Sequence, residues 1–318
     1  MQNKSSCIVV LGTGGTIAGT SAPQAPEGRY QAAQLDIAVL LAGVPGLAEA
    51  AAGCALTSEP VAQVDSKDMD FEVWQALLAR VEWHLARAEV RGVVITHGTD
   101  TLEETAYFLH RTLRTSKPVA LTAAMRPATS AQADGPAHLR QAVSAVAQGG
   151  WAGVAVVLQG EAHHPCLVRK VHPRALQAFT SGEAGPVARW QNPHWQRLRD
   201  LTPDQAPVPP SVRTQAAGTW PWTEVLHSHA GARAQAVQSW VDAGVAGLVV
   251  VATGNGTLHH VLVDALQAAQ RTGVRVWRCS RCADAGLDPQ SDDGSPFAAS
   301  ALSPAKARVA LMLSLMSP

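Results

Sequence analysis

Residues 93–106 read VVITHGTDTLEETA. The segment opens with a β-branched run, Val93 to Thr96, that predicts a buried strand. A polar turn follows, and then Glu103 and Glu104 stand where carboxylates favour the positive end of a helix that begins near Leu102. Strand, polar turn and helix in this order are the repeating unit of an α/β fold.

The same alternation recurs along the whole chain. Apolar runs predict further strands at Ile8 to Leu11, Val119 to Thr122, Val154 to Leu158, Leu248 to Ala252 and Val274 to Trp277. Helical periodicity predicts helices at Phe71 to Ala88, Leu102 to Leu113, Ala137 to Gln148, Ala232 to Ala243 and Leu258 to Thr272. Continuous apolar strands separated by helices indicate a mostly parallel sheet covered on both faces, so the predicted fold class is α/β.

A proline-rich stretch divides the chain. Residues 201–212 read LTPDQAPVPPSV, a composition that cannot continue a helix and is typical of a linker. We therefore expect a large N-terminal domain over residues 1–200, with a mostly parallel sheet flanked by helices, and a smaller C-terminal α/β domain over residues 213–318. Ligands of parallel sheets bind beyond the carboxyl ends of the strands, so catalytic residues are expected in the turns that follow them.

Composition and charge exclude several function classes. The chain has 25 Lys and Arg against 25 Asp and Glu, so its formal net charge of zero argues against nucleic-acid or anionic-membrane partners. No apolar run approaches the roughly 20 residues of a membrane span, and no secretory signal precedes Ile8, which predicts a cytoplasmic protein. Five cysteines, an odd number, fit reduced thiols.

No metal site is predicted from the spacing of cysteines and histidines. Cys279 and Cys282 form a Cys-x-x-Cys pair without the second pair that a zinc site needs. The adjacent pairs His163–His164 and His259–His260 point their side chains in different directions in either a strand or a helix.

The first turn after a predicted strand is rich in glycine. Residues 12–19 read GTGGTIAG, which has Ile17 where a dinucleotide-binding loop needs its third glycine and lacks the lysine of a P-loop. The turn instead presents the hydroxyls of Thr13 and Thr16. They could cap a helix or bond the backbone, just as Asp100 or Thr101 could be the N-cap of the helix after the second turn.

Two turns, residues 13–19 (TGGTIAG) and 97–101 (HGTDT), together resemble those of the bacterial-type L-asparaginase family. Further blocks resemble the family in the same order, and the resemblance runs from about Ile8 to Met316. These blocks are residues 65–69 (DSKDM), 124–127 (AMRP), 133–136 (ADGP), 169–172 (RKVH), 178–179 (AF), 254–257 (GNGT) and 302–308 (LSPAKAR).

The resemblance implies a role for each of a small set of residues. Thr16 would be the nucleophile, activated by Tyr30 of a mobile loop, and Thr99, Lys170 and Asp100 would form a hydroxyl–amine–carboxylate triad. A threonine hydroxyl needs such a neighbouring base because it is a weak nucleophile near neutral pH. The implied substrate-binding residues are Ser66, Lys67, Thr99, Asp100, Ala124 and Asn255, of which Asn255 would reach the site of a neighbouring subunit.

Three positions depart from the family pattern. Lys67 stands where Gln or Ser is common, and its cation would repel a substrate ammonium unless the side chain turns away. Asp292 or Asp293 would have to replace a glutamate that many relatives contribute from a neighbouring subunit. Ala123 and His138 occupy positions where glycine and asparagine are more usual. These departures bear on substrate affinity and on the choice between asparagine and glutamine.

The sequence therefore predicts a cytoplasmic L-asparaginase that releases aspartate and ammonia through an acyl-threonine. We expect a homotetramer built from two intimate dimers, the small molecule L-asparagine as its substrate, and no metal or organic cofactor. The alternatives are a broad-specificity glutaminase-asparaginase, the relative that supplies ammonia for tRNA amidation, and an inactive amino-acid sensor. The tRNA-associated relative ranks low because it usually carries an additional N-terminal domain.

Overall fold

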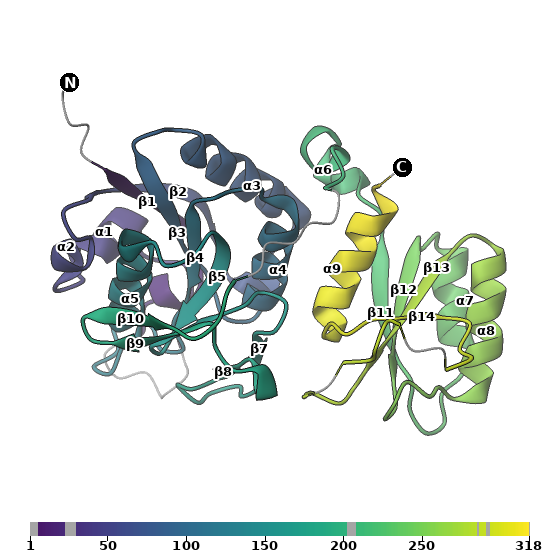
Figure 1. The fold of residues 1–318 in the computed structure, drawn as a ribbon. Helices are drawn as coiled ribbons and strands as arrows, with labels where there is room; N and C mark the ends of the chain where they lie inside the picture. The colour runs from purple at the N-terminus through teal and green to yellow at the C-terminus, as the bar shows by residue number, and fades with distance from the viewer. Residues whose placement is uncertain (1–5, 23–29, 202–207, 285, 291–292, 318) are drawn as a thin grey trace. The chain divides into compact units, whose positions relative to one another are not determined.

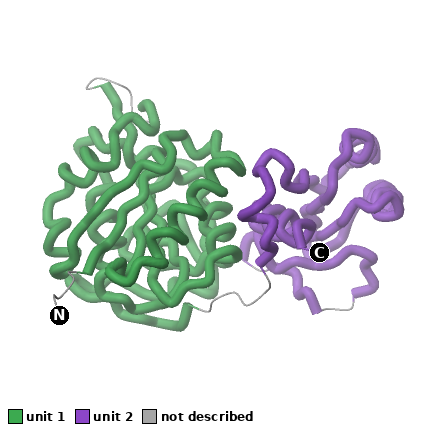
Figure 2. Tube along the Cα trace, turned by 90° about the horizontal axis from the view of Figure 1, so that it is seen from above, with its two compact units in different colours: residues 1–205 green, residues 206–318 purple. Residues whose placement is uncertain are grey.

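The structure is a computed structural model that describes residues 6–22, 30–201, 208–284, 286–290 and 293–317. The chain divides into two compact units, Met1–Gln205 and Ala206–Pro318 (Figure 2). Residues 202–207 of the predicted linker lie outside the described residues, and its last two residues begin helix α6 (Ser211–Thr214). None of the described helices has the length and apolar character needed to cross a bilayer.

An eight-stranded sheet forms the centre of unit 1 (Figure 1). Its strands are β1 (Cys7–Gly14), β2 (Ala55–Val64), β3 (Val90–Thr96), β4 (Pro118–Thr122), β5 (Gly153–Leu158), β6 (Glu161–His163), β9 (Ala188–Gln191) and β10 (His194–Arg197). They lie in the order β10-β9-β6-β5-β4-β3-β1-β2, parallel from β5 to β2 and antiparallel from β5 to β10. The mostly parallel sheet confirms the predicted α/β class.

Helices cover both faces of this sheet (Figure 1). One face carries α3 (Phe71–Leu85) and α4 (Leu102–Thr112), and the other carries α1 (Ile37–Ala42), α2 (Leu47–Ala50) and α5 (Gly135–Gln148). Successive strand residues point to opposite faces: Ile8 and Val10 of β1 belong to the buried cluster that contains Leu139 of α5. A separate antiparallel pair, β7 (Arg169–Lys170) and β8 (Phe179–Thr180), stands apart from the large sheet.

Unit 2 has its own four-stranded parallel sheet and its own core. The strands are β11 (Thr223–His227), β12 (Gly247–Ala252), β13 (Arg275–Ser280) and β14 (Ala298–Ala299), in that order across the sheet. Leu248 and Val250 pack into the cluster formed with α7 (Gln235–Asp242) and α8 (His260–Arg271). Val249 and Val251 face the other way, against α9 (Pro304–Leu315).

All six predicted strands and all five predicted helices exist, and the differences lie in element ends and in elements that were not predicted, among them helices α1, α2 and α9. The helix expected over residues 71–88 ends at Leu85, and the helix expected from Leu258 begins at His260, with His259 as its N-cap. Strand β2 was not predicted, because its partly exposed residues, ALTSEPVAQV, contain no continuous apolar run. It lies at the edge of the sheet, where only one side is paired and Pro60 is tolerated.

Candidate active site

The two glycine-containing turns meet at one edge of the sheet of unit 1. Strands β1 and β3 are parallel neighbours, so the turns that follow them emerge side by side. A Cβ atom at Gly15, which has φ +79°, would lie 2.8 Å from the carbonyl carbon of His97. Such contact leaves no room for any side chain at Gly15. The backbones carrying Thr16 and Thr99 therefore pack directly against each other.

Thr16 is paired with Tyr30, as the family resemblance implied. Thr16 begins a short 3-10 helix, Thr16–Ala18, and is buried, and its Oγ1 lies 2.7 Å from the phenol oxygen of Tyr30. Either oxygen can be the donor. Thr13 plays a different part: its hydroxyl donates to the carbonyl of Thr96 at 2.9 Å and so joins β1 to β3. Only Thr16 of this turn is therefore held beside another reactive side chain.

Thr99, Asp100 and Lys170 form the second group. The side-chain nitrogen of Lys170 donates to Thr99 Oγ1 at 2.9 Å and to Asp100 Oδ1 at 2.6 Å. The backbone N–H of Lys170 donates to Glu103 Oε1 at 2.6 Å, so the first turn of α4 anchors β7. Because Thr99 Oγ1 accepts from Lys170, its own hydroxyl hydrogen is directed to some other acceptor.

Ser66 joins the loop that follows β2 to the second turn. Its side chain is buried, and its Oγ accepts the backbone N–H of Asp100 at 3.1 Å. Its carbonyl accepts the hydroxyl of Thr101 at 2.7 Å. Thr101 occupies the N-cap position of α4, but its side chain makes no capping bond. Of the two N-cap candidates, Asp100 and Thr101, the structure thus selects Thr101, whose hydroxyl bonds the Ser66 carbonyl instead of a backbone N–H of α4.

The side chain of Lys67 forms ion pairs with residues of its own loop. Its ammonium pairs with Asp68 and lies 3.6 Å from Asp65, and its side chain is largely exposed. The hydrogen bond that Lys67 donates to Asp68, with the charge of Asp65 in second place, raises the pKa of Lys67. The Lys67 backbone N–H reaches Asp65 Oδ1 at 3.5 Å. The nearest described partners of the cation are therefore acidic side chains of the same short segment.

The segment after β4 is held by two residues of the following helix. Asp134 accepts the backbone N–H groups of Met125 and Arg126, both at 2.9 Å. The Nδ1 of His138 lies 2.8 Å from the carbonyl of Ala123, so it carries the hydrogen. Burial lowers the pKa of His138. The peptide that contains Ala124 is thus fixed on both sides.

His97 orients the peptide that links Gly98 to Thr99. Its ring is fully buried, and its Nδ1 donates to the Gly98 carbonyl at 2.7 Å. In a trans peptide the C=O and the N–H point in opposite directions. The N–H of Thr99 is therefore turned away from His97. Desolvation by burial lowers the pKa of His97 to about 4, so the donor is a neutral imidazole.

In unit 2, Asn255 lies exposed on the turn between Thr253 and Thr257. The turn is held by Arg278, which is buried and donates to the Gly256 carbonyl at 3.1 Å and to Asp293 Oδ1 at 2.6 Å. This hydrogen bond from Arg278 also lowers the pKa of Asp293. Asp293 is therefore committed to Arg278, and Asp292 lies outside the described residues.

Three residues that hold the site in place were not predicted to do so from the sequence. Glu103 was read only as a dipole-matching residue of α4, His138 only as a departure from the family pattern, and Asp134 only as part of a family block. Each acts through a contact with a residue distant in sequence or across a turn. The available signal was that Glu103 closely follows a predicted turn and that Asp134 closely precedes the helix predicted from Ala137.

Fold and site define a two-unit α/β enzyme with threonine hydroxyls beside an amine and a carboxylate. A model of the N-terminal domain of asparaginases matches residues 7–202, and a model of the C-terminal domain of glutaminases and asparaginases matches residues 223–317. The chain therefore belongs to the asparaginase family of amidohydrolases. The family resemblance of the sequence is thus confirmed.

Individual relatives cover almost the whole chain. L-asparaginase 2 of Escherichia coli is 36% identical in an alignment that covers 97% of this chain and 88% of that protein. A glutaminase-asparaginase of Pseudomonas fluorescens is 34% identical over 99% of this chain and 87% of its own length. A crystal structure from Campylobacter jejuni, described as a probable cytoplasmic L-asparaginase, superposes with a TM-score of 0.89 at 33% identity, covering 99% and 96% of the two chains.

Proposed function

We propose that this protein is an L-asparaginase that hydrolyses L-asparagine to L-aspartate and ammonia, with Thr16 as the nucleophile. One observation carries this proposal: each of two threonine hydroxyls has a partner, Tyr30 for Thr16 and Lys170 for Thr99. The two turns that carry these threonines are in backbone contact. A nucleophilic hydroxyl needs a group that accepts its proton. Two such pairs suit a reaction with two nucleophilic steps.

In the first step the Thr16 oxygen attacks the side-chain amide carbon. The Tyr30 phenol oxygen accepts the hydroxyl proton as the phenol's own proton passes to the leaving nitrogen, so the C–N bond breaks, ammonia departs and an aspartyl-threonine ester remains. The negative charge on the amide oxygen needs fixed N–H donors. The N–H of Thr99, oriented by His97, is one candidate donor.

In the second step water attacks the ester. In its neutral amine form Lys170 would take the proton of that water, which the Thr99 hydroxyl orients, and would pass it to the Thr16 oxygen as the ester bond breaks and aspartate leaves. Asp100, with 54% of its side chain exposed, would hold Lys170 and pair with the substrate ammonium, since opposite charges attract strongly in a closed pocket. Ser66 and the backbone of Lys67 would bind the α-carboxylate, and the Ala124 carbonyl would accept a hydrogen from the amide or its water.

Unit 2 would complete the site of a neighbouring subunit through Asn255, which the turn held by Arg278 leaves exposed. This role requires a homo-oligomer, built from intimate dimers, and divides the chain into a catalytic domain over residues 1–200 and a completing domain over residues 213–318. A cytoplasmic location follows the description of the Campylobacter jejuni relative. Neither step above draws on a metal or an organic cofactor.

A broader substrate range is the second candidate. The glutaminase-asparaginase relative is nearly as similar to this chain as the asparaginase relative, at 34% against 36% identity. Glutamine is longer by one methylene group, a difference that a pocket discriminates by about 10–200-fold. The ratio of kcat/KM for asparagine to that for glutamine separates the two candidates.

The proposal is tested by ammonia release from L-asparagine. Wild type should turn over, whereas Thr16→Ala and Thr99→Val should each lose at least about 100-fold in kcat. Thr13→Val is the matched control, because the Thr13 hydroxyl bonds only the backbone of β3. Loss of this hydroxyl should lower the free energy of unfolding and leave kcat unchanged. Equal background release by wild type and by both site variants would favour the amino-acid sensor and refute the enzyme.

A further inference from the structure

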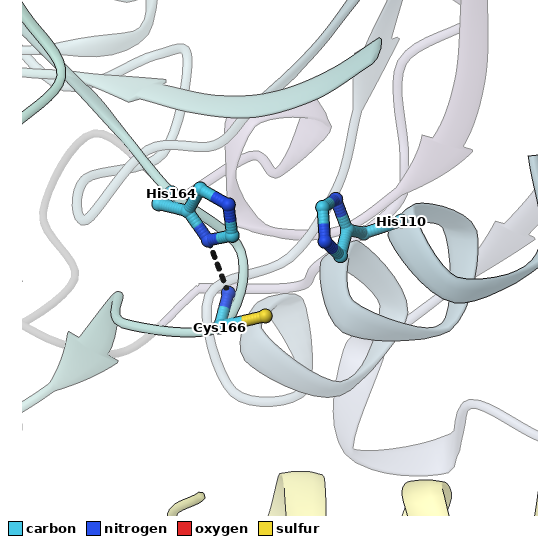
Figure 3. A group of neighbouring side chains, drawn as sticks. All are labelled: His110, His164 and Cys166. Atoms are coloured by element: carbon cyan, nitrogen blue, oxygen red, sulfur yellow. Dashed lines mark hydrogen bonds between the residues drawn. The ribbon is translucent and has the colours of Figure 1, made fainter. Parts of the chain in front are cut away.

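A cluster of soft metal ligands lies in unit 1, outside the site described above. It consists of His110, His164 and Cys166, each of which offers one ligand atom within 4.8 Å of those of the other two (Figure 3). His110 comes from the last turn of α4, whereas His164 and Cys166 belong to the turn between β6 and β7. Among the described residues, this is the group that combines imidazole nitrogens with a thiol.

We propose that these three side chains bind one divalent cation, with Zn²⁺ as the best fit. Two imidazole nitrogens and one thiolate match the preference of Zn²⁺ for nitrogen and sulfur ligands, and water would fill the fourth tetrahedral position. Oxygen-preferring cations such as Mg²⁺ and Ca²⁺ are poorly served by this set, since it contains no carboxylate. The Cys166 thiol would release its proton to solvent on binding.

The geometry needs only local adjustment. Ligand atoms around tetrahedral zinc lie about 3.3–3.7 Å apart, so the present spacing has to close by about 1 Å through side-chain rotation. The His110 and His164 rings already meet edge to face, with centroids 4.8 Å apart and planes at 71°. The Cys166 sulfur points to the side on which His110 lies (Figure 3).

The backbone holds His164 and Cys166 ready for this adjustment. The N–H groups of Leu167 and Val168 donate to the His164 carbonyl at 2.9 and 3.0 Å and close a tight turn. The Cys166 N–H donates to His164 Nδ1 at 3.1 Å. Coordination through Nε2 would place a hydrogen on Nδ1, so this bond opens when metal binds. The three metal–ligand bonds would compensate for the loss of this neutral hydrogen bond.

The surroundings favour a cation at this position. His110 lies in the last turn of α4, where the unsatisfied carbonyls of a helix carry partial negative charge. The ring of His110 is buried, which limits the orientations that a metal must fix. A bound cation would join the end of α4 to the chain that leads into Lys170, while Glu103 at the start of α4 already holds the Lys170 backbone. The metal would thus brace the lysine without entering the chemistry.

The test measures metal binding rather than turnover. Chelator-treated full-length protein is titrated with Zn²⁺ by calorimetry and with Co²⁺ by absorption. We expect one equivalent of Zn²⁺ per chain, and with Co²⁺ a thiolate-to-metal charge-transfer band together with the d–d bands of a tetrahedral site. Cys166→Ser and His110→Gln should each weaken Zn²⁺ binding by at least about tenfold. Cys166→Ser should also abolish the charge-transfer band.

Cys282→Ser is the matched control, the same change at an exposed thiol of unit 2, and it should leave binding at wild-type strength. Bound Zn²⁺ should also protect Cys166, but not Cys282, from alkylation as followed by mass spectrometry. That measurement on the wild type keeps the proposal testable if the variants fold poorly. Absence of binding by wild type, unchanged binding by Cys166→Ser, or equal alkylation with and without Zn²⁺ would each overturn the proposal.

Discussion

The side-chain nitrogen of Lys170 lies 2.9 Å from the hydroxyl oxygen of Thr99, although the two residues are 71 positions apart in the chain. The contact depends on two anchors: Glu103 holds the backbone of Lys170, and Asp100 holds its ammonium at 2.6 Å. The lysine therefore leaves the Thr99 hydroxyl hydrogen free to face an incoming molecule.

Lys170→Met should separate the two chemical steps. We expect kcat to fall by about 10²–10⁴, because water loses the group that takes its proton, while attack by Thr16 survives. Rapid-quench measurements should then show a burst of ammonia, and mass spectrometry an aspartyl ester on Thr16. Lys117→Met is the control: Lys117 binds only the carbonyls of Leu85 and Arg87, so its loss should lower stability and spare kcat. A slow variant without a burst would assign Lys170 to acylation instead.

Tyr30→Phe should impair the first step. Removing the phenol oxygen deletes the 2.7 Å contact with Thr16 and with it the immediate proton acceptor, so kcat/KM for asparagine should fall by about 100-fold. No ammonia burst is expected in this variant. The chain has two tyrosines, and Tyr107→Phe, at a buried position of α4, is the matched control that should retain wild-type kcat/KM. Equal activity of the two variants would remove Tyr30 from the mechanism.

Gly98→Ala should disable the site while the fold survives. The added methyl carbon would lie 2.6 Å from Ser66 Cβ and closer still to its hydroxyl oxygen, so the Ser66 loop and the Thr99 turn must separate. A displacement of about 1 Å at a catalytic group costs on the order of 100-fold in rate. Gly150→Ala is the control, since no atom lies within 4 Å of a Cβ there. Steady-state kinetics with wild-type activity in Gly98→Ala would contradict the close packing of the turns.

Acid should destabilise the protein before its carboxylates titrate. Burial lowers the pKa of His97 and of His163 to about 4, whereas an unfolded histidine has a pKa of about 6.5. The unfolded chain therefore binds more protons between these values. The free energy of unfolding is therefore highest above about pH 6.5. It falls as the pH approaches 4, by up to about 3 kcal/mol for each of the two histidines.

Urea unfolding midpoints measured at several pH values test this expectation. His163→Gln should reduce the fall of the midpoint with decreasing pH, whereas the same change at the exposed His229 should leave that fall as in the wild type. Glu59 has a lowered pKa, chiefly because Arg80 donates a hydrogen bond to it, so its contribution to stability is complete above the ordinary glutamate pKa of 4.5 and is lost only as the pH falls below that value. The decline between pH 6.5 and 4.5 therefore reports on the histidines. A midpoint independent of pH across this window would refute the role of the buried histidines.

The sequence by itself determined the α/β class, the six buried strands and the two turns that carry Thr16 and Thr99. These features depend on local patterns, namely runs of β-branched residues, helical periodicity and glycine followed by hydroxyl residues, all of which are read within about ten residues of one another. The family blocks also identified Lys170 and Ser66 from the sequence, because each block is a short continuous segment even though the site joins distant segments.

Tertiary structure decided everything that requires two distant segments to meet. The anchoring of Lys170 by Glu103, the pairing of Asp293 with Arg278 and the gathering of His110 beside His164 and Cys166 all join residues from separate elements. Edge strand β2 was hidden for the same reason, since its stability comes from pairing with β1 rather than from its own composition. Backbone periodicity is a property of neighbours in the chain, whereas charge pairing and metal ligation depend on distance in space.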